Sequence, residues 1–233
     1  MNDSASSPSL RVVLFGATGA AGSGVLRQCL ADARVAEVVA VTRRPLNVES
    51  SKLTEVICSD FLDLEPLGAH LVGVDGCFYC LGVSQTQVPD PARYREITYD
   101  YALAAARALL RHSPAHTFHF LSGSGADPSG RSRILFARVK GETEVALQGL
   151  GLAGIVCWRP GYIHPLHPRE NPHWSERVMR MIYPPLRGLK GLSIAADDLG
   201  RAMLQAAVED RREGVIDNAE MRALAGRYVS TPS

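Results

Sequence analysis

The sequence lacks an excess of charge of either sign: 25 Lys and Arg residues stand against 24 Asp and Glu residues in 233 positions, a formal net charge of +1. This balance argues against binding to nucleic acid through overall charge, and no basic stripe interleaved with aromatic residues is present. A run of about 18 or more apolar residues is also absent, so we expect no membrane-spanning helix. Hydrophobic residues (46%) and charged residues (21%) occur at globular frequencies, which excludes a disordered chain.

The N-terminal segment lacks the basic start and apolar run of a secretory signal, so we expect residues 1–9 to form a flexible tail. Cysteines are few and odd in number, at five. Cys77 and Cys80 form a C-x-x-C pattern, but on a predicted strand residues three apart face opposite sides. The sequence therefore predicts reduced, packed cysteines in a cytoplasmic protein, with no zinc site.

Short apolar runs alternate with helical patterns over the first two-thirds of the chain. The expected strands are residues 10–15, 35–42, 55–58, 74–81, 116–121 and 152–158, and the expected helices are residues 20–33, 92–111, 131–150 and 195–208. Near-continuous apolar strands separated by helices indicate an α/β fold, with a parallel sheet covered on both faces. We expect one domain over residues 10–233, in which the proline-rich segment 160–195 caps the carboxyl edge of the sheet.

A glycine-rich turn directly follows the first expected strand and opens the first expected helix. It consists of Gly16, Ala17, Thr18, Gly19, Ala20, Ala21 and Gly22. Glycine at such positions allows a tight turn, lets backbone amides approach a pyrophosphate, and brings helix and strand close together. The free N–H groups of the helix N-terminus then face the phosphates. The turn therefore predicts a dinucleotide site.

The end of the second expected strand lacks the acid that would accept a hydrogen bond from the ribose 2′-hydroxyl of NAD. In its place the sequence has Thr42, Arg43 and Arg44. Two guanidinium groups suit a 2′-phosphate, because arginine makes charge-assisted and often bidentate hydrogen bonds to phosphate oxygens. This pattern favours NADP(H) over NAD(H) as the cofactor; the alternative is a solvated basic loop.

Six segments in this order resemble the atypical short-chain dehydrogenases/reductases, and in particular the Tat-interacting-protein type of NADPH-binding oxidoreductase. They are GATGAAG, VTRR, SDFLDL, CLG, VKGETE and WRPG, and the resemblance covers about residues 10–210. It implies a doubly wound Rossmann sheet with strand order 3-2-1-4-5-6 and a small C-terminal cap that covers the substrate.

The resemblance also implies roles for individual residues. Asp60 and Phe61 would lie beside the adenine, with the carboxylate of Asp60 accepting from its amino group. The other implied cofactor contacts are Cys80, Leu81 and Gly82 at the end of the fourth strand, and Pro160, Gly161 and Ile163 around the nicotinamide.

The helix over residues 131–150 lacks the tyrosine of the Tyr-x-x-x-Lys pattern of these reductases. Lys140 is present and would hold the nicotinamide ribose, but Phe136 occupies the tyrosine position. A phenyl ring donates no proton, and general acid–base catalysis typically contributes about 10²–10⁴-fold. The alternative for Lys140 is a solvated lysine that pairs with Glu144 one turn later.

Other side chains remain as candidate proton donors. Ser124 matches the substrate-polarising serine of the family, and Tyr162 or His164 could reach the same pocket. Three interpretations stay open: an NADP(H)-dependent oxidoreductase acting on a small flavin, quinone or carbonyl substrate, a non-catalytic NADP(H)-binding regulator or redox sensor, and a different reaction with a structural nucleotide. We expect a monomer or homodimer whose partner is a small molecule rather than nucleic acid or a membrane.

Two further clusters favour structural roles. His164, His167 and His173 are close in sequence, but the intervening prolines prevent regular spacing, so we expect no metal site. Asp197 and Asp198 at the start of the last expected helix are typical of helix capping and dipole interactions.

Overall fold

The computed structural model describes residues 9–164 and 193–231. The predicted tail is therefore outside the described residues except for Ser9, and the predicted cap over 160–195 is described only at its two ends. His167 and His173 also lie outside the described residues.

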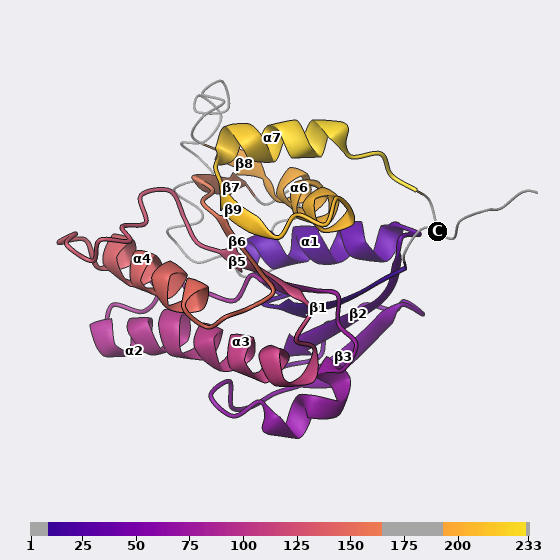
Figure 1. The fold of residues 1–233 in the computed structure, drawn as a ribbon, viewed down its shortest axis with the longest axis horizontal. Helices are drawn as coiled ribbons and strands as arrows, with labels where there is room; N and C mark the ends of the chain where they lie inside the picture. The colour runs from indigo at the N-terminus through magenta and orange to yellow at the C-terminus, as the bar shows by residue number, and fades with distance from the viewer. Residues whose placement is uncertain (1–8, 165–192, 232–233) are drawn as a thin grey trace, which may run out of the picture.

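Seven parallel strands form a central sheet (Figure 1). They are β1 (Leu10–Phe15), β2 (Val35–Thr42), β3 (Leu53–Ile57), β4 (Gly76–Tyr79), β5 (Thr117–Leu121), β6 (Gly154–Trp158) and β9 (Glu213–Ile216). Their order is β3-β2-β1-β4-β5-β6-β9, and every neighbouring pair is parallel. The predicted α/β fold and the order of the first six strands are confirmed, and β9 adds a seventh strand.

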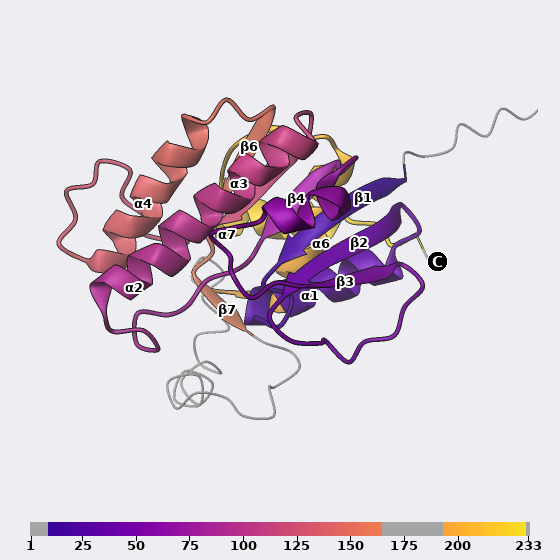
Figure 2. The ribbon, with the colours of Figure 1, turned by 90° about the horizontal axis from the view of Figure 1, so that it is seen from below.

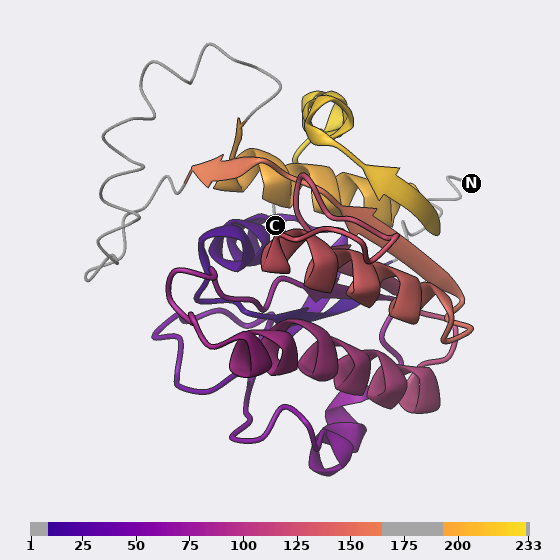
Figure 3. The same ribbon diagram turned by 90° about the vertical axis from the view of Figure 1, so that its left-hand side faces the viewer.

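Helices cover both faces of the sheet (Figure 3). On one face lie α1 (Ala20–Ala31), α6 (Ala196–Val208) and α7 (Asn218–Arg227). The other face carries the 3-10 helix η1 (Glu65–Leu71), α2 (Pro91–Arg95), the π-helical turn η2 (Glu96–Asp100), α3 (Tyr101–His112) and α4 (Leu135–Gln148). Figure 2 shows α3 and α4 running side by side, roughly along the direction of the strands. No helix in the described part of the chain has the length and apolar character to cross a membrane.

The alternating side chains of β1 explain why two cores form. Val12 and Leu14 pack in the core beneath α1 and α6, whereas Val13 and Phe15 pack in the core on the α3 side. All four are fully buried. Because successive side chains of a strand point to opposite faces, an unbroken apolar run is needed where both faces are covered.

The structure divides the helix that the sequence predicts over residues 92–111. Asp90 caps α2 by accepting hydrogen bonds from the backbone N–H groups of Ala92 and Arg93. The π turn η2 then separates α2 from α3. Tyr101, the first residue of α3, stacks on Phe61 with ring centroids 5.6 Å apart. A single π turn has no hydrophobic period of its own, so the apolar pattern did not reveal it.

The sequence also failed to predict five short elements: η1, β7 (Tyr162–His164), β8 (Ser193–Ala195), β9 and α7. Strands β7 and β8 pair with each other as a separate parallel ribbon. A capping signal for α7 is present in the sequence, because the carboxylate of Asp217 accepts from the backbone N–H groups of Ala219 and Glu220.

The five cysteines are free and buried. Cys77 packs in the core on the α3 side and Cys80 in the core on the α1 side, which confirms that the C-x-x-C pair faces opposite sides of the sheet. Burial raises the pKa of Cys80 to about 12. Within the described ranges, no three His, Cys, Asp or Glu residues form a group that could hold a metal ion.

Candidate functional site

A cleft of about 510 Å³ opens at the carboxyl ends of β1, β2 and β4. Its walls come from the loops that follow four different strands. The lining residues are Gly16, Thr18, Val41, Thr42, Arg43, Arg44, Pro45, Asn47, Phe61 and Leu81. In parallel α/β sheets, the crevice outside the carboxyl ends of the strands is where ligands bind.

The glycine-rich turn between β1 and α1 leaves no room for side chains at two of its positions. Gly16 adopts a φ of +83°, and a Cβ atom there would lie 2.6 Å from the backbone nitrogen of Leu81. A Cβ atom at Gly22 would lie 2.1 Å from the carbonyl oxygen of Gly16. The turn is closed by a hydrogen bond of 2.9 Å from Gly19 N–H to the Gly16 carbonyl. These contacts hold the N-terminus of α1 against the end of β4.

The start of α1 has free capacity for an anion. Gly19 is its N-cap and supplies no side-chain hydrogen bond, and the first turn contains no acidic residue. The first N–H groups of a helix have no partner within the helix and carry the positive end of its dipole. A phosphate group at this edge of the sheet would accept hydrogen bonds from these N–H groups and would be attracted by the positive end of the dipole.

Arg43 and Arg44 lie exposed in the wall of the cleft, directly after β2. The hydroxyl of Thr42 shapes the turn by donating to the carbonyl oxygen of Arg44 at 2.9 Å. Among the ion pairs found in residues 9–164 and 193–231, none involves either arginine. Two guanidinium groups are therefore available to an anion in the cleft.

Of the two residues that the resemblance assigns to the adenine, one lines the cleft and the other does not. Phe61 is buried, lines the cleft, and meets Phe15 edge-to-face at a centroid distance of 6.4 Å. Asp60 is exposed and is not part of the cleft wall. One oxygen of its carboxylate accepts from the backbone N–H of Leu62 at 2.8 Å, as in an Asx turn.

The segment that follows β4 connects the cleft to the helix that carries Lys140. The backbone N–H of Cys80 donates to the carbonyl oxygen of Phe15 at 3.0 Å, which holds this segment against β1. Leu81 lines the cleft. A Cβ atom at Gly82 would lie 3.9 Å from the Nζ atom of Lys140, so the lysine amine is close to the cleft's edge.

Lys140 on α4 is buried, with 7% of its surface exposed. Its Nζ atom donates to the carbonyl oxygen of Leu121 at 2.7 Å and lies 4.7 Å from the ring centroid of Phe120. Burial lowers the pKa of Lys140 to about 8, although the nearby Glu144 opposes this shift. The alternative of a solvated lysine is therefore wrong.

Glu144 pairs with Arg159 instead, and sequence analysis missed this contact. The carboxylate of Glu144 is 2% exposed and accepts from Arg159 Nε at 3.0 Å and from Arg159 Nη2 at 2.5 Å. Glu144 belongs to the VKGETE segment and Arg159 to the WRPG segment. The opposite charges of these two segments were the sequence signal that could have predicted the pair. The pair joins α4 to the end of β6.

Phe136, one turn before Lys140, lies against the loop that follows β5. A Cβ atom at Gly123 would be 2.5 Å from the Cζ atom of the Phe136 ring. Only a residue without a side chain fits beneath the ring without rearrangement. The position that carries a hydroxyl in the family pattern therefore holds an apolar ring packed on backbone.

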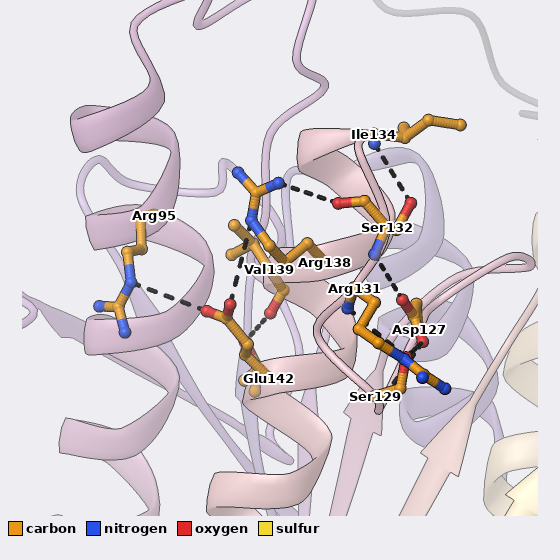
Figure 4. Close-up of polar contacts among 10 residues, drawn as sticks. Arg95, Asp127, Ser129, Arg131, Ser132, Ile134, Arg138, Val139 and Glu142 are labelled. Carbon is orange, nitrogen blue, oxygen red and sulfur yellow. Dashed lines mark hydrogen bonds and ion pairs between the residues drawn. The ribbon is translucent and has the colours of Figure 1, made fainter.

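The loop before α4 is organised around Asp127 (Figure 4). Its carboxylate accepts from the backbone N–H groups of Ser129 and Ser132, at 3.0 Å and 2.7 Å, and from the Ser129 hydroxyl. These bonds keep residues 127–134 out of the helix, so α4 begins at Leu135 rather than at the predicted residue 131. The Asp127 carbonyl oxygen lies only 2.0 Å from where a Cβ atom of Gly141 would be, so the loop packs on the helix.

On the outer side of α4, Glu142 forms one ion pair with α2 and one within α4. Glu142 lies 3.9 Å from Arg95 and 4.0 Å from Arg138 (Figure 4). All three side chains are more than a third exposed, and such pairs contribute little to stability. The position of Lys140 therefore depends mainly on burial and on the packing of the Asp127 loop.

The serine loop after β5 and the loop after β6 are fastened together by backbone hydrogen bonds. Ser122 N–H donates to the Trp158 carbonyl at 2.8 Å, and Ser124 N–H donates to the Pro160 carbonyl at 2.7 Å. Ser124, the predicted polarising serine, is exposed. Ser122 is buried, and its Oγ atom finds no hydrogen-bond partner among the described residues. Ser122 is thus a second polar group at this edge that sequence analysis did not single out.

The segment Pro160–Ile163 continues from this loop. Gly161 N–H donates to the side-chain oxygen of Asn218 on α7 at 3.3 Å, and Ile163 packs against the core on the α1 side. Tyr162 is half-buried on β7, with its ring centroid 6.5 Å from that of His164. The structure thus brings the segments of Ser124, Lys140 and Tyr162 to one edge of the sheet.

Comparison with known proteins gives two kinds of relative, although no protein-family model matches the chain. The chain is 28% identical to Protein HTATIP2 of Rattus norvegicus over 201 residues, which are 84% of this chain and 81% of the relative. It is 27% identical to Protein fmp52, mitochondrial, of Emericella nidulans over 208 residues, which are 85% of this chain and 87% of the relative.

Solved structures share the fold at lower identity. A UDP-N-acetylglucosamine 4-epimerase from Methanobrevibacter ruminantium aligns with a TM-score of 0.70 and 20% identity, over 89% of this chain and 76% of that chain. The UDP-glucose 4-epimerase of Thermus thermophilus, solved in complex with NAD, aligns with a TM-score of 0.67 and 21% identity, over 96% of this chain and 85% of that chain. The relatives and the fold together confirm the resemblance to atypical short-chain dehydrogenases/reductases of the Tat-interacting-protein type.

The predicted cytoplasmic location is contradicted by the same comparison. Relatives from Emericella nidulans, Chaetomium globosum and Aspergillus terreus are named mitochondrial proteins. The prediction rested on the missing secretory signal and on reduced cysteines. Neither feature distinguishes the cytoplasm from other reducing compartments, and for this reason the inference failed.

The buried amine of Lys140 predicts a specific pH dependence of stability. Its pKa is lowered from 10.5 to about 8 in the folded protein, so the stability that this group contributes is fully present above pH 10.5 and is lost as the pH falls through 8. Raising the pH from about 7 to about 10 should therefore stabilise the wild type relative to Lys140→Met by about 2 kcal/mol.

Denaturant titrations of both proteins at each pH measure this difference. Taking the difference cancels the titration of the buried thiols, which both proteins share. A difference in unfolding free energy that is constant across this pH range would contradict a desolvated amine at position 140.

Proposed function

We propose that this protein binds NADP(H) in the cleft at the carboxyl edge of the sheet and uses it as an oxidoreductase. The relatives and the fold support an NAD(P)-binding protein of the short-chain dehydrogenase/reductase type; the preference for NADP(H) is our inference. One observation carries it: Arg43 and Arg44 are exposed in the cleft wall, form no ion pair within the described ranges, and replace the acid that an NAD site would have.

The residues of the cleft fit the parts of such a nucleotide. The turn Gly16–Gly22 and the N-terminus of α1 would hold the pyrophosphate, and Arg43 and Arg44 the 2′-phosphate. Phe61 would contact the adenine, while Asp60 would have to turn its free carboxylate oxygen toward the adenine amino group. Gly82 and Lys140 would lie near the nicotinamide ribose, with residues 160–163 beyond them.

The chemistry of the reaction would be limited by Phe136. When bound, NADPH supplies a hydride, and a substrate that accepts it must also gain a proton unless it is stable as an anion. Position 136 offers no proton, so Ser124, Tyr162 or solvent would have to provide one. A quinone or flavin suits this site better than a simple ketone, because the reduced ring delocalises its charge and can be protonated by water.

Phe136 also favours a second candidate function. A protein that keeps the phosphate-binding turn, the arginine pair and Lys140 but lacks the hydroxyl can bind the nucleotide without turnover. In that case it would act as a regulator whose conformation depends on which nucleotide is bound. We treat residues 10–233 as one domain with a small-molecule partner under either proposal.

The double variant Arg43→Ala/Arg44→Ala tests the cofactor preference. Loss of two charge-assisted contacts should weaken NADPH binding about 10- to 100-fold, whereas NADH binding should change little. Arg107→Ala is the matched control, because Arg107 is exposed on α3, outside the cleft. Calorimetric titration of each protein with both nucleotides gives the affinities; equal affinities that the double variant leaves unchanged would refute the preference for NADP(H).

Phe136→Tyr separates the enzyme from the regulator. NADPH oxidation is measured with flavin, quinone and carbonyl acceptors for the wild type, Phe136→Tyr and the control Phe136→Leu. If the wild type is an oxidoreductase of the proposed kind, it turns over quinones or flavins, and only the tyrosine variant gains carbonyl reduction, by about 10²-fold. Tight NADPH binding with no turnover of any acceptor by the wild type would favour the regulator.

A further inference from the structure

A second cavity, of about 620 Å³, lies at the opposite edge of the sheet from the nucleotide cleft. It is bounded by the amino ends of β1, β4 and β5 and by the last turn of α6. Leu10, Val12, Val74 and Val208 give it an apolar wall. A volume of this size is within the range of small-molecule sites, which are mostly apolar with a few placed polar groups.

One buried histidine that lines this cavity has a ring nitrogen without a hydrogen-bond partner among the described residues. His119 on β5 is fully buried, and its Nδ1 atom accepts a hydrogen bond of 3.3 Å from the indole N–H of Trp158. Burial lowers the pKa of His119 to about 3, so the ring is neutral near pH 7. Because Nδ1 acts as an acceptor, the single ring proton is on Nε2.

The Nε2–H group of His119 finds no acceptor among the described residues. The indole N–H of Trp158 already occupies Nδ1, so Nε2 is the ring nitrogen that remains for a ligand in the cavity that His119 lines. A buried donor without an acceptor costs about 1–3 kcal/mol, which a ligand with an acceptor group would recover.

Each arginine that lines the cavity already has a carboxylate partner. Arg34 pairs with Asp32 at 2.6 Å, Arg212 pairs with Asp210 at 3.0 Å, and Arg211 pairs with Glu220. An anionic ligand would have to compete with these carboxylates for the guanidinium groups. The lining therefore favours a neutral ligand over a charged one.

We propose that this cavity is a second ligand site, which takes a small, neutral, predominantly apolar molecule whose one hydrogen-bond acceptor, such as a ketone oxygen, is held by His119 Nε2–H. The site is independent of the nucleotide cleft, because none of the residues that line one cavity lines the other. The acceptor fixes the orientation of the ligand, and burial of apolar surface supplies most of its affinity.

Two probes of the same shape test the site: benzophenone, which carries a ketone oxygen, and diphenylmethane, which has a methylene group in its place. Each is titrated into the full-length wild type and into His119→Phe by calorimetry. The substitution should weaken benzophenone binding about 3- to 10-fold, the value of one neutral hydrogen bond, and leave diphenylmethane binding unchanged.

His116→Phe is the matched control. His116 is also a buried histidine with an unpartnered Nε2 atom, but it does not line the cavity. This variant should bind both probes as the wild type does. Equal weakening of benzophenone in both histidine variants, or no weakening in His119→Phe, would overturn the role of His119.

Ala207→Trp provides a test that keeps His119 intact. Ala207 lines the cavity from α6, so an indole there should occupy it and weaken both probes at least 10-fold. Circular dichroism and thermal unfolding establish that each variant is folded. Unchanged binding of both probes to folded Ala207→Trp would show that they bind elsewhere and would overturn the proposal.

Discussion

Two backbone segments approach each other so closely at the end of β1 that only glycine fits between them. Side-chain atoms at Gly16 or Gly22 would lie within 2.6 Å of the backbone of Leu81 or of Gly16 itself. This contact sets the distance between the N-terminus of α1 and the segment that follows β4. The cleft, its amide groups and the approach of Gly82 to Lys140 all depend on it.

The cationic side chains at the carboxyl edge of the sheet differ in their exposure to solvent, and this difference suits them to different roles. Arg43 and Arg44 are exposed and available to a ligand. Lys140 is buried against the Leu121 carbonyl, where desolvation lowers its pKa to about 8. An exposed guanidinium can bind a mobile phosphate, whereas a buried amine near its pKa is sensitive to small changes in its surroundings.

Much of the fold could be predicted from the sequence, because near-continuous apolar strands and the glycine turn are local patterns. The limits of β1 and β2 agree with the structure for this reason. The strand order came from the family resemblance. Strand β9 was missed because the segment Glu213–Ile216 has a single buried residue, and its pairing with β6 is a long-range contact.

In the candidate site, too, the residues in local sequence patterns were predicted and the long-range contacts were not. Gly16, Thr18, Arg43, Arg44 and Leu81 were all predicted and all line the cleft, since each lies in the loop that follows a strand. The Glu144–Arg159 pair, the orphan hydroxyl of Ser122 and the unpartnered nitrogen of His119 were not predicted. Each depends on which side chains tertiary packing buries together, and no spacing in the sequence encodes that.

The most direct test of the NADP(H) assignment compares adenosine 2′,5′-bisphosphate with adenosine 5′-monophosphate, because the two differ only in the 2′-phosphate. Calorimetric titration into the wild-type protein should show at least about 10-fold tighter binding of the bisphosphate, the value of one charge-assisted phosphate contact. This advantage should disappear in Arg43→Ala/Arg44→Ala. Equal binding of the two nucleotides by the wild type would contradict the account.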